Sequence, residues 1–124
     1  MSKSRVSETS EQIKVVWELR RLKLLFTSTL NGERLRSKSQ AKRVKAAGME
    51  KGVPDLLIFE PPEGSPYVGV ALEMKREGGV RSDVRKEQRE WMARLQSFGW
   101  ACIVGYGARD ALTKLCALGY DVRV

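Results

Sequence analysis

Three residues of this chain could carry out hydrolysis if folding brought them together. Asp55 opens the apolar segment 56–59, and Glu73 and Lys75 stand at the end of the apolar segment 68–75. Side chains alternate between the two faces of a strand, so Glu73 and Lys75 point the same way. Two carboxylates and a lysine at one edge of a sheet suit a divalent cation and a water that attacks a phosphodiester. We therefore take Asp55, Glu73 and Lys75 as candidate catalytic residues.

Two further polar residues lie on helices that could border the same site. Glu8 falls on the apolar stripe of a helix expected over 8–24, nearer its middle than Glu11 does. Gln88 is the one polar member of the stripe on a helix expected over 83–98, which otherwise carries Val84, Trp91, Leu95 and Phe98. In the interpretation we favour, Asp55 and Glu73 hold Mg²⁺ or Mn²⁺ and Glu8 completes the oxygen ligands. Lys75 then orients the water or stabilises charge on the phosphate, and Gln88 positions the water or Lys75.

Each of these residues also has a plainer explanation. An aspartate beside a proline is commonly a turn residue, and a Glu–Lys pair can decorate an exposed strand. Glu8 could simply favour a helix N-terminus, and Gln88 could be a hydrogen-bonded core amide. However, the strand face of Glu73 and Lys75 also carries Gly69 and Ala71, which indicates a covered surface.

Composition narrows the chemistry. The chain has no histidine, which excludes Ser-His-Asp triads, Cys-His nucleophiles and zinc–histidine sites. The net charge is +8, and all of it lies in residues 1–54, with 13 basic and 5 acidic residues. A basic half beside an acidic centre suits a polyanion such as nucleic acid, although solubility alone would also explain it. Cys102 and Cys116, in apolar surroundings without a CxxC pair, indicate buried thiols in a reducing, cytoplasmic compartment. We expect no signal peptide, membrane span or small-molecule cofactor.

The basic half supplies candidate DNA contacts. A second helix is expected over 38–47, ended by Gly48, and its basic residues would bind phosphates rather than read bases. The plainer interpretation is a solvated helix face. The candidate contacts are Asn31, Arg34, Lys38, Lys42, Lys45 and Lys51.

The expected elements make one domain over 1–124. A helix capped by Ser7, a short strand or irregular return over 24–30 and an Asn31-Gly32 turn precede the basic helix. Strands at 55–59 and 68–75, the helix over 83–98, a strand at 101–105, a helix at 110–118 and an edge strand at 120–124 follow. This order predicts an α/β fold with a mixed sheet and helices on its faces.

An ordered set of motifs resembles the VRR-NUC family of the PD-(D/E)XK nucleases. The set comprises Gly52-Val53-Pro54-Asp55, Glu73-Met74-Lys75 and Gln88-Arg89-Glu90-Trp91, supported by Glu8-x-x-x-Gln12 at the start. The resemblance covers nearly the whole chain and is closest to the compact stand-alone members common in phages and prophages. One departure is Arg85, which stands where the family often places a serine three residues before the glutamine.

The resemblance implies the restriction-endonuclease-like fold, with a four-stranded mixed sheet and an αβββαβ core. It implies a metal-dependent endonuclease in which Asp55, Glu73, Lys75 and Gln88 take the family positions. Glu8 takes the acid on the first helix, with Glu11 as the alternative. Stand-alone members resemble Holliday-junction resolvases and form homodimers, which implies branched DNA such as four-way junctions as the partner. The alternatives are a nicking or sequence-directed nuclease and a catalytically silent DNA-binding module.

Overall fold

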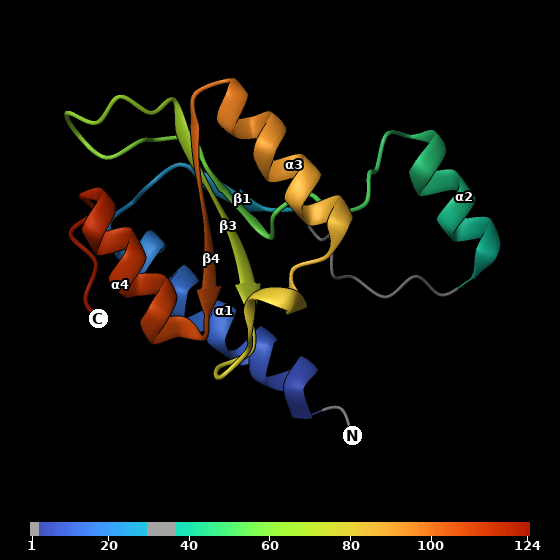
Figure 1. Ribbon diagram of the computed structural model, residues 1–124, viewed down its shortest axis with the longest axis horizontal. Helices are drawn as coiled ribbons and strands as arrows, with labels where there is room; N and C mark the ends of the chain where they lie inside the picture. The colour runs from blue at the N-terminus through green and yellow to red at the C-terminus, as the bar shows by residue number, and fades with distance from the viewer. Residues whose placement is uncertain (1–2, 30–36) are drawn as a thin grey trace.

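The computed structural model describes residues 3–29 and 37–124, with side chains from residue 8 onward. Its elements form three layers, in which α1 and α4 cover one face of a central sheet and α3 covers the other (Figure 1). The short helix α2 stands to the side of these layers (Figure 1). In chain order the elements are α1 (Lys3–Arg21), β1 (Phe26–Ser28), α2 (Lys38–Ala46), β2 (Leu56–Ile58), β3 (Gly69–Lys75), the 3₁₀ turn η1 (Arg81–Asp83), α3 (Lys86–Ser97), β4 (Trp100–Tyr106) and α4 (Ala108–Leu118).

The sheet is mixed, as the sequence predicts. Its strand order is β1-β2-β3-β4, with antiparallel pairing from β1 to β3 and parallel pairing between β3 and β4. The helix α3 provides the crossover that a parallel pair requires. The elements follow the expected αβββαβ order, with α2 inserted between β1 and β2 and α4 added after β4, so the predicted α/β fold class is confirmed.

The strand β3 is the centre of the molecule, because all seven of its residues are buried. Val70, Leu72 and Met74 join the main core between the sheet and the two helices α1 and α4. Those helices contribute residues such as Val15, Leu19, Ala111 and Leu115. The opposite face of β3 carries Ala71, Glu73 and Lys75 under α3. The prediction that this second face is covered is therefore confirmed, and a buried carboxylate there needs partners.

The helix α3 is only partly the apolar element that the sequence predicts. Val84 is buried and Trp91 and Leu95 are half-buried, but Phe98 is 66% exposed. The helix ends at Ser97, so Phe98 lies beyond the turn that packs on the sheet, and the guanidinium of Arg94 lies 5.8 Å from its ring centroid. The expectation of a buried Phe98 was wrong because the apolar pattern in the sequence continues one residue beyond the end of the helix.

The two cysteines are both free thiols, as the sequence predicts, but they differ in burial. Cys102 on β4 is half-buried, and its Sγ donates to the carbonyl of Met92 at 3.5 Å. Cys116 on α4 is exposed, so the expectation of a buried thiol was wrong at this position. Leu115 is buried in the core and Leu118 packs against it, whereas Cys116 lies on the exposed side of the helix.

Both ends of the chain differ from expectation. The helix α1 begins at Lys3 rather than after Ser7. Residues 120–124 do not form an edge strand. Instead the hydroxyl of Tyr120 donates to the carbonyl of Glu60 at 2.6 Å, and the amide of Arg123 donates to the Glu18 carboxylate at 2.6 Å. These contacts hold the tail against α1, away from the sheet edges.

Within the described residues, no helix is long and apolar enough to cross a membrane. The expected strand within 24–30 is confirmed as β1, and the expected basic helix is confirmed as α2 with Ser37 as its N-cap. The chain passes beyond α2 through Gly48, whose φ of +108° favours glycine. The predicted Asn31-Gly32 turn lies outside the described residues.

Candidate active site

The register of two antiparallel strands places Asp55 beside Glu73. Leu56 pairs with Leu72 and Leu57 with Ala71, so the residue before Leu56 comes opposite the residue after Leu72. Side chains of directly opposite residues share a sheet face. The Asp55 carboxylate is held there by the amide of Met74, which donates to its Oδ2 at 2.7 Å. The backbone of Asp55 is fixed as well, because its carbonyl accepts from the amide of Thr29 at 3.0 Å.

Glu73 is the most buried acid of this cluster, with 4% of its surface exposed. Its Oε2 accepts from Nε2 of Gln88 at 2.7 Å and lies 3.6 Å from Nζ of Lys75. Its Oε1 is buried and has no hydrogen-bond donor among the described residues. An unpaired buried carboxylate oxygen is costly, and it is the feature of this site that most calls for a ligand.

The two carboxyl groups have raised pKa values because burial disfavours their charged forms. Burial and then the neighbouring charge of Asp55 raise the pKa of Glu73 to about 8. Burial also raises the pKa of Asp55, and the nearby Glu8 carboxylate adds to that rise, whereas the Met74 amide and Lys75 oppose it. Without a cation, the pair therefore retains a proton near neutral pH, as two close carboxyl groups do.

Lys75 ends β3 on the same side as Glu73, as the alternation of the strand predicts. Only 8% of its surface is exposed, and its Nζ is directed to the Glu73 carboxylate. Parallel pairing with Tyr106 and a bond from the amide of Gly107 to the Lys75 carbonyl at 2.9 Å fix this strand end. The lysine head is thus held close to the carboxylates by the backbone on both sides.

Gln88 reaches the site from the first turn of α3. Its Oε1 accepts from the amide of Arg85, the N-cap residue, at 2.8 Å, while its Nε2 donates to Glu73. A serine at position 85 would bring its own capping hydroxyl. Because Arg85 stands there instead, Gln88 does two things at once: it caps the helix and it orients the Glu73 carboxylate.

Gly52 sets how closely α3 approaches, a role that its place in the sequence motif does not by itself reveal. Its φ is +91°, and a Cβ atom there would lie 2.6 Å from the carbonyl carbon and oxygen of Glu87. The loop before Asp55 therefore lies directly against the turn that holds Gln88. The sequence does indicate this role indirectly. A glycine such as Gly52, close to a proline and an acid before a strand, often marks a close approach of two backbone segments.

The structure separates the two candidate acids of α1. Glu8 is half-buried and close enough to Asp55 to influence its pKa. Glu11 is the more buried, with 8% exposed, although the helical stripe predicts the reverse. Its carboxylate binds Nζ of Lys14 at 2.7 Å and accepts from the amide of Ala108 at 3.4 Å. Glu11 thus links α1 to the first turn of α4 and is occupied by that contact.

The donor set fits a hard divalent cation. Asp55 and Glu73 offer carboxylate oxygens, and the buried Oε1 of Glu73 has no other described partner. No three acidic or cysteine side chains in the described ranges form a ready metal-binding group. Among the described residues, the Asp55–Glu73 pair is therefore the part of this set that could hold a cation, and Glu8 is close enough to influence Asp55.

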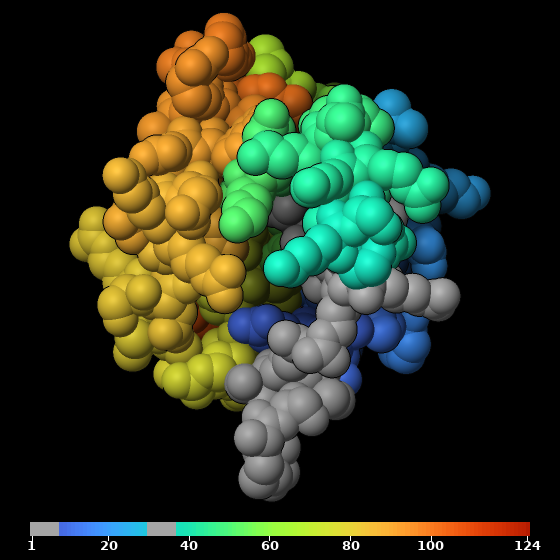
Figure 2. Space-filling model, turned by 90° about the vertical axis from the view of Figure 1, so that its right-hand side faces the viewer, coloured from blue at the N-terminus to red at the C-terminus, as the bar shows by residue number. Residues whose placement is uncertain are grey.

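Figure 2 shows a hollow between α3 and α2, with the start of α1 below it. The four described DNA-contact candidates, Lys38, Lys42, Lys45 and Lys51, are exposed on α2 and the turn after it. Within the described residues, no hydrogen bond or ion pair joins any of the four to Asp55 or Glu73. Asn31 and Arg34 lie outside the described residues.

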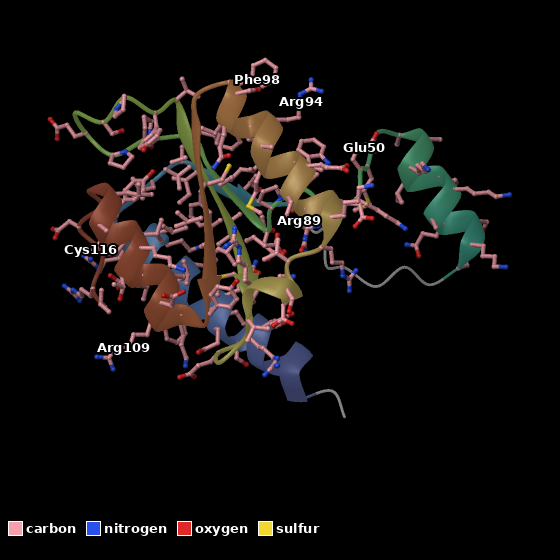
Figure 3. The ribbon with its side chains drawn as sticks, in the orientation of Figure 1. Glu50, Arg89, Arg94, Phe98, Arg109 and Cys116 are labelled. Carbon is pink, nitrogen blue, oxygen red and sulfur yellow. The ribbon has the colours of Figure 1, made fainter. Side chains whose placement is uncertain are left out.

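A basic residue beside Gln88 was also missed. Arg89 lies at the start of α3 (Figure 3), where its Nη1 donates to the carbonyl of Val84 at 2.6 Å. The net charge of residues 55–124 does not reveal Arg89, because the 10 basic and 10 acidic residues of this segment cancel. The first two turns of the expected helix over 83–98 carry Arg85, Lys86 and Arg89.

Comparisons with known proteins agree with this geometry. The model of the VRR-NUC domain family matches residues 5–109. A solved structure described as a VRR_NUC domain protein superposes with a TM-score of 0.65 at 21% identity, over 90% of this chain and 87% of that one. No curated protein matches the chain.

Proposed function

Because this chain belongs to the VRR-NUC domain family, a family of nuclease domains, we propose that it is a metal-dependent DNA endonuclease of the cytoplasm. The proposed reaction is hydrolysis of a phosphodiester bond with Mg²⁺ or Mn²⁺. The observation that carries this proposal is the Asp55–Glu73 pair, in which one oxygen of the buried Glu73 has no described donor and Nζ of Lys75 lies 3.6 Å from the other.

The chain supplies positions and charges for this reaction. Asp55 and Glu73 would hold the cation, which when bound lowers the pKa of water and neutralises charge on the phosphate. The Met74 amide and Gln88 fix the carboxylates in place through bonds of 2.7 Å each. Lys75 brings a positive charge to the same point, where it can orient the water or stabilise the transition state. Glu8 is the acid of α1 that remains available to this centre, since Glu11 is bound to Lys14 and Ala108.

We further propose branched DNA, such as a four-way junction, as the substrate and a homodimer as the active assembly. Two symmetric cuts need two sites, which a two-fold dimer provides. One surface supports such pairing: Trp91, Leu95 and Phe98 line a cavity of about 460 Å³ on α3 with Glu90 and Arg94. In an antiparallel pair of α3 helices, Glu90 of one copy would meet Arg94 of the other. Phe98→Glu should then yield a monomer in light scattering at concentrations where the wild type is a dimer.

A cleavage assay tests the activity. Purified protein is incubated with four-way junctions, flaps and linear duplex in Mg²⁺ or Mn²⁺, beside Asp55→Asn, Lys75→Gln and the exposed control Glu63→Gln. Loss of one such electrostatic group is expected to slow junction cleavage on the order of 100-fold or more, while the control cuts normally. Cleavage of linear duplex at one sequence would favour a sequence-directed nuclease. Salt-sensitive binding without a product in either metal would favour a silent DNA-binding module.

A further inference from the structure

A second cavity lies between α1 and the free edge of the sheet. It measures about 340 Å³ and is distinct from the apolar cavity on α3. Its walls are Gln12, Val16 and Arg20 of α1 and Phe26, Thr27 and Ser28 of β1. Among the described residues no acidic side chain lines it, and the one charged group in this lining is the guanidinium of Arg20.

Both walls of this cavity continue into the active site. Gln12 lies one helical turn, ~6 Å, after Glu8, the acid that influences Asp55. On the other wall, Ser28 immediately precedes Thr29, whose amide donates to the Asp55 carbonyl at 3.0 Å. The end of the cavity at Gln12 and Ser28 is therefore the end nearer Asp55, and the end at Arg20 and Phe26 is the farther one.

Among the described residues, the free edge of β1 offers backbone donors without a partner to this cavity. The amide of Thr29 bonds to the carbonyl of Asp55, and the amide of Phe59 bonds to the carbonyl of Leu25. Hydrogen-bonded pairs alternate in an antiparallel ladder, so Thr27 also faces β2, whereas the amides of Phe26 and Ser28 point to the open edge. An exposed strand edge of this kind presents N–H groups to a partner.

The side chains add two more donors. Arg20 is exposed and its guanidinium has no hydrogen bond or ion pair with any described residue. The Gln12 amide is likewise without a described partner. A guanidinium with free donors near exposed amides and a hydroxyl matches the oxygens of a phosphodiester.

We propose that this cavity binds the phosphodiester backbone of the nucleic-acid strand that flanks the scissile bond. Arg20 binds one phosphate at the far end, and Gln12 and the amide of Ser28 contact the backbone nearer the carboxylates. This assignment rests on the proposed nuclease function and adds a direction to it: the strand leaves the site along α1, on the side opposite α3.

The helix sets the reach of this contact. Arg20 is twelve residues beyond Glu8, so it lies ~18 Å along the axis of α1. That length spans about five phosphates of one B-form strand. Arg20 is therefore expected to matter only for DNA that extends several nucleotides past the cleavage point on this side.

The test is the salt dependence of DNA binding in EDTA, where hydrolysis plays no part. Arg20→Gln is compared with Arg20→Lys and with Arg109→Gln, which removes the same charge at the start of α4, on the far side of the molecule from α2 (Figure 3). Loss of one phosphate contact should weaken binding about 5- to 20-fold. It should also lower the slope of log K against log salt by about 0.7–0.9. Arg20→Lys should retain the slope, and Arg109→Gln should match the wild type.

A length series locates the contact. On strands trimmed to end next to the scissile phosphate, Arg20→Gln and the wild type should bind alike; on longer strands they should differ. Equal slopes for all four proteins on long strands would overturn the proposal. So would a melting-temperature shift by inorganic phosphate that Arg20→Gln loses while its DNA binding is unchanged, since the cavity would then take free phosphate. A wild type that binds DNA but cuts none would instead count against the nuclease function alone.

Discussion

Glu73 offers the sharpest test of the site, because its burial has a measurable cost when no cation is present. Only 4% of its surface is exposed, and its pKa in the folded protein is about 8. In the unfolded chain the ordinary value is 4.5. Between pH 4.5 and about 8, the folded state therefore keeps a proton on Glu73 that the unfolded chain has lost. The stability that this proton supports is complete below pH 4.5 and is lost as the pH rises to about 8.

The magnitude follows from the width of that window. One pKa unit corresponds to about 1.4 kcal/mol, but Asp55 shares the proton, so we expect a loss of roughly 2–4 kcal/mol by pH 7.5. Glu73→Gln carries no charge to bury, and its amide oxygen can still accept from Gln88. In EDTA the variant should therefore be less stable or equal at pH 5 and clearly more stable than the wild type at pH 7.5.

Urea unfolding at a series of pH values measures this difference. Glu63→Gln, an exposed residue in a loop, is the control and should follow the wild type at every pH. Mg²⁺ or Mn²⁺ should then stabilise the wild type at pH 7.5 and leave Glu73→Gln unchanged, because a bound ligand stabilises only the state that binds it. Parallel curves for wild type and variant across the whole range would refute the reasoning about the buried pair.

Three further predictions concern the residues around the pair. Gly52→Ala should destabilise the protein by more than the roughly 1 kcal/mol of its φ of +91°, because the new Cβ meets Glu87; Gly64→Ala, with φ +78° and open space, is the control in urea unfolding, and equal losses would contradict the close approach. Gln88→Ala should slow cleavage by roughly 10- to 100-fold, as loss of a residue that orients a ligand does, with melting temperature measured alongside; an unchanged rate would exclude this role. Glu11→Gln should lower the melting temperature at neutral pH and leave the affinity for the cation unchanged. Glu8→Gln should lower only the affinity for the cation, which titration calorimetry measures. The opposite result for the two variants would exchange the roles of Glu8 and Glu11.

The sequence alone predicted the strands β2, β3 and β4 and placed Glu73 and Lys75 together on one of them. Alternation along 68–75 is a local property of the backbone, so the common face of Glu73 and Lys75 followed from it directly. The apolar runs likewise predicted β2, β3 and β4, because a strand buried on both faces needs apolar residues throughout. The absence of histidine excluded imidazole ligands whatever the fold, which left carboxylate oxygens as the natural ligands for a hard cation.

Local sequence patterns did not predict where the helices end or which of Glu8 and Glu11 is the more buried. Periodicity placed Glu8 nearer the stripe than Glu11, yet Glu11 is buried by a bond to the amide of Ala108, 97 residues away in the chain. No local pattern encodes a partner at that distance. The exposure of Phe98 has a similar origin, since α3 ends at Ser97 and the apolar pattern alone does not fix that end.

The residue types and the order of the strands, both written in the sequence, determined which groups this protein could bring to a reaction. Only the tertiary structure decided their pairing: the antiparallel register that sets Asp55 opposite Glu73, and the approach of α3 over Gly52 that delivers Gln88. The physical reason is that burial and electrostatic coupling depend on distances between segments far apart in the chain. The raised pKa of Glu73 belongs to that arrangement and to no residue by itself.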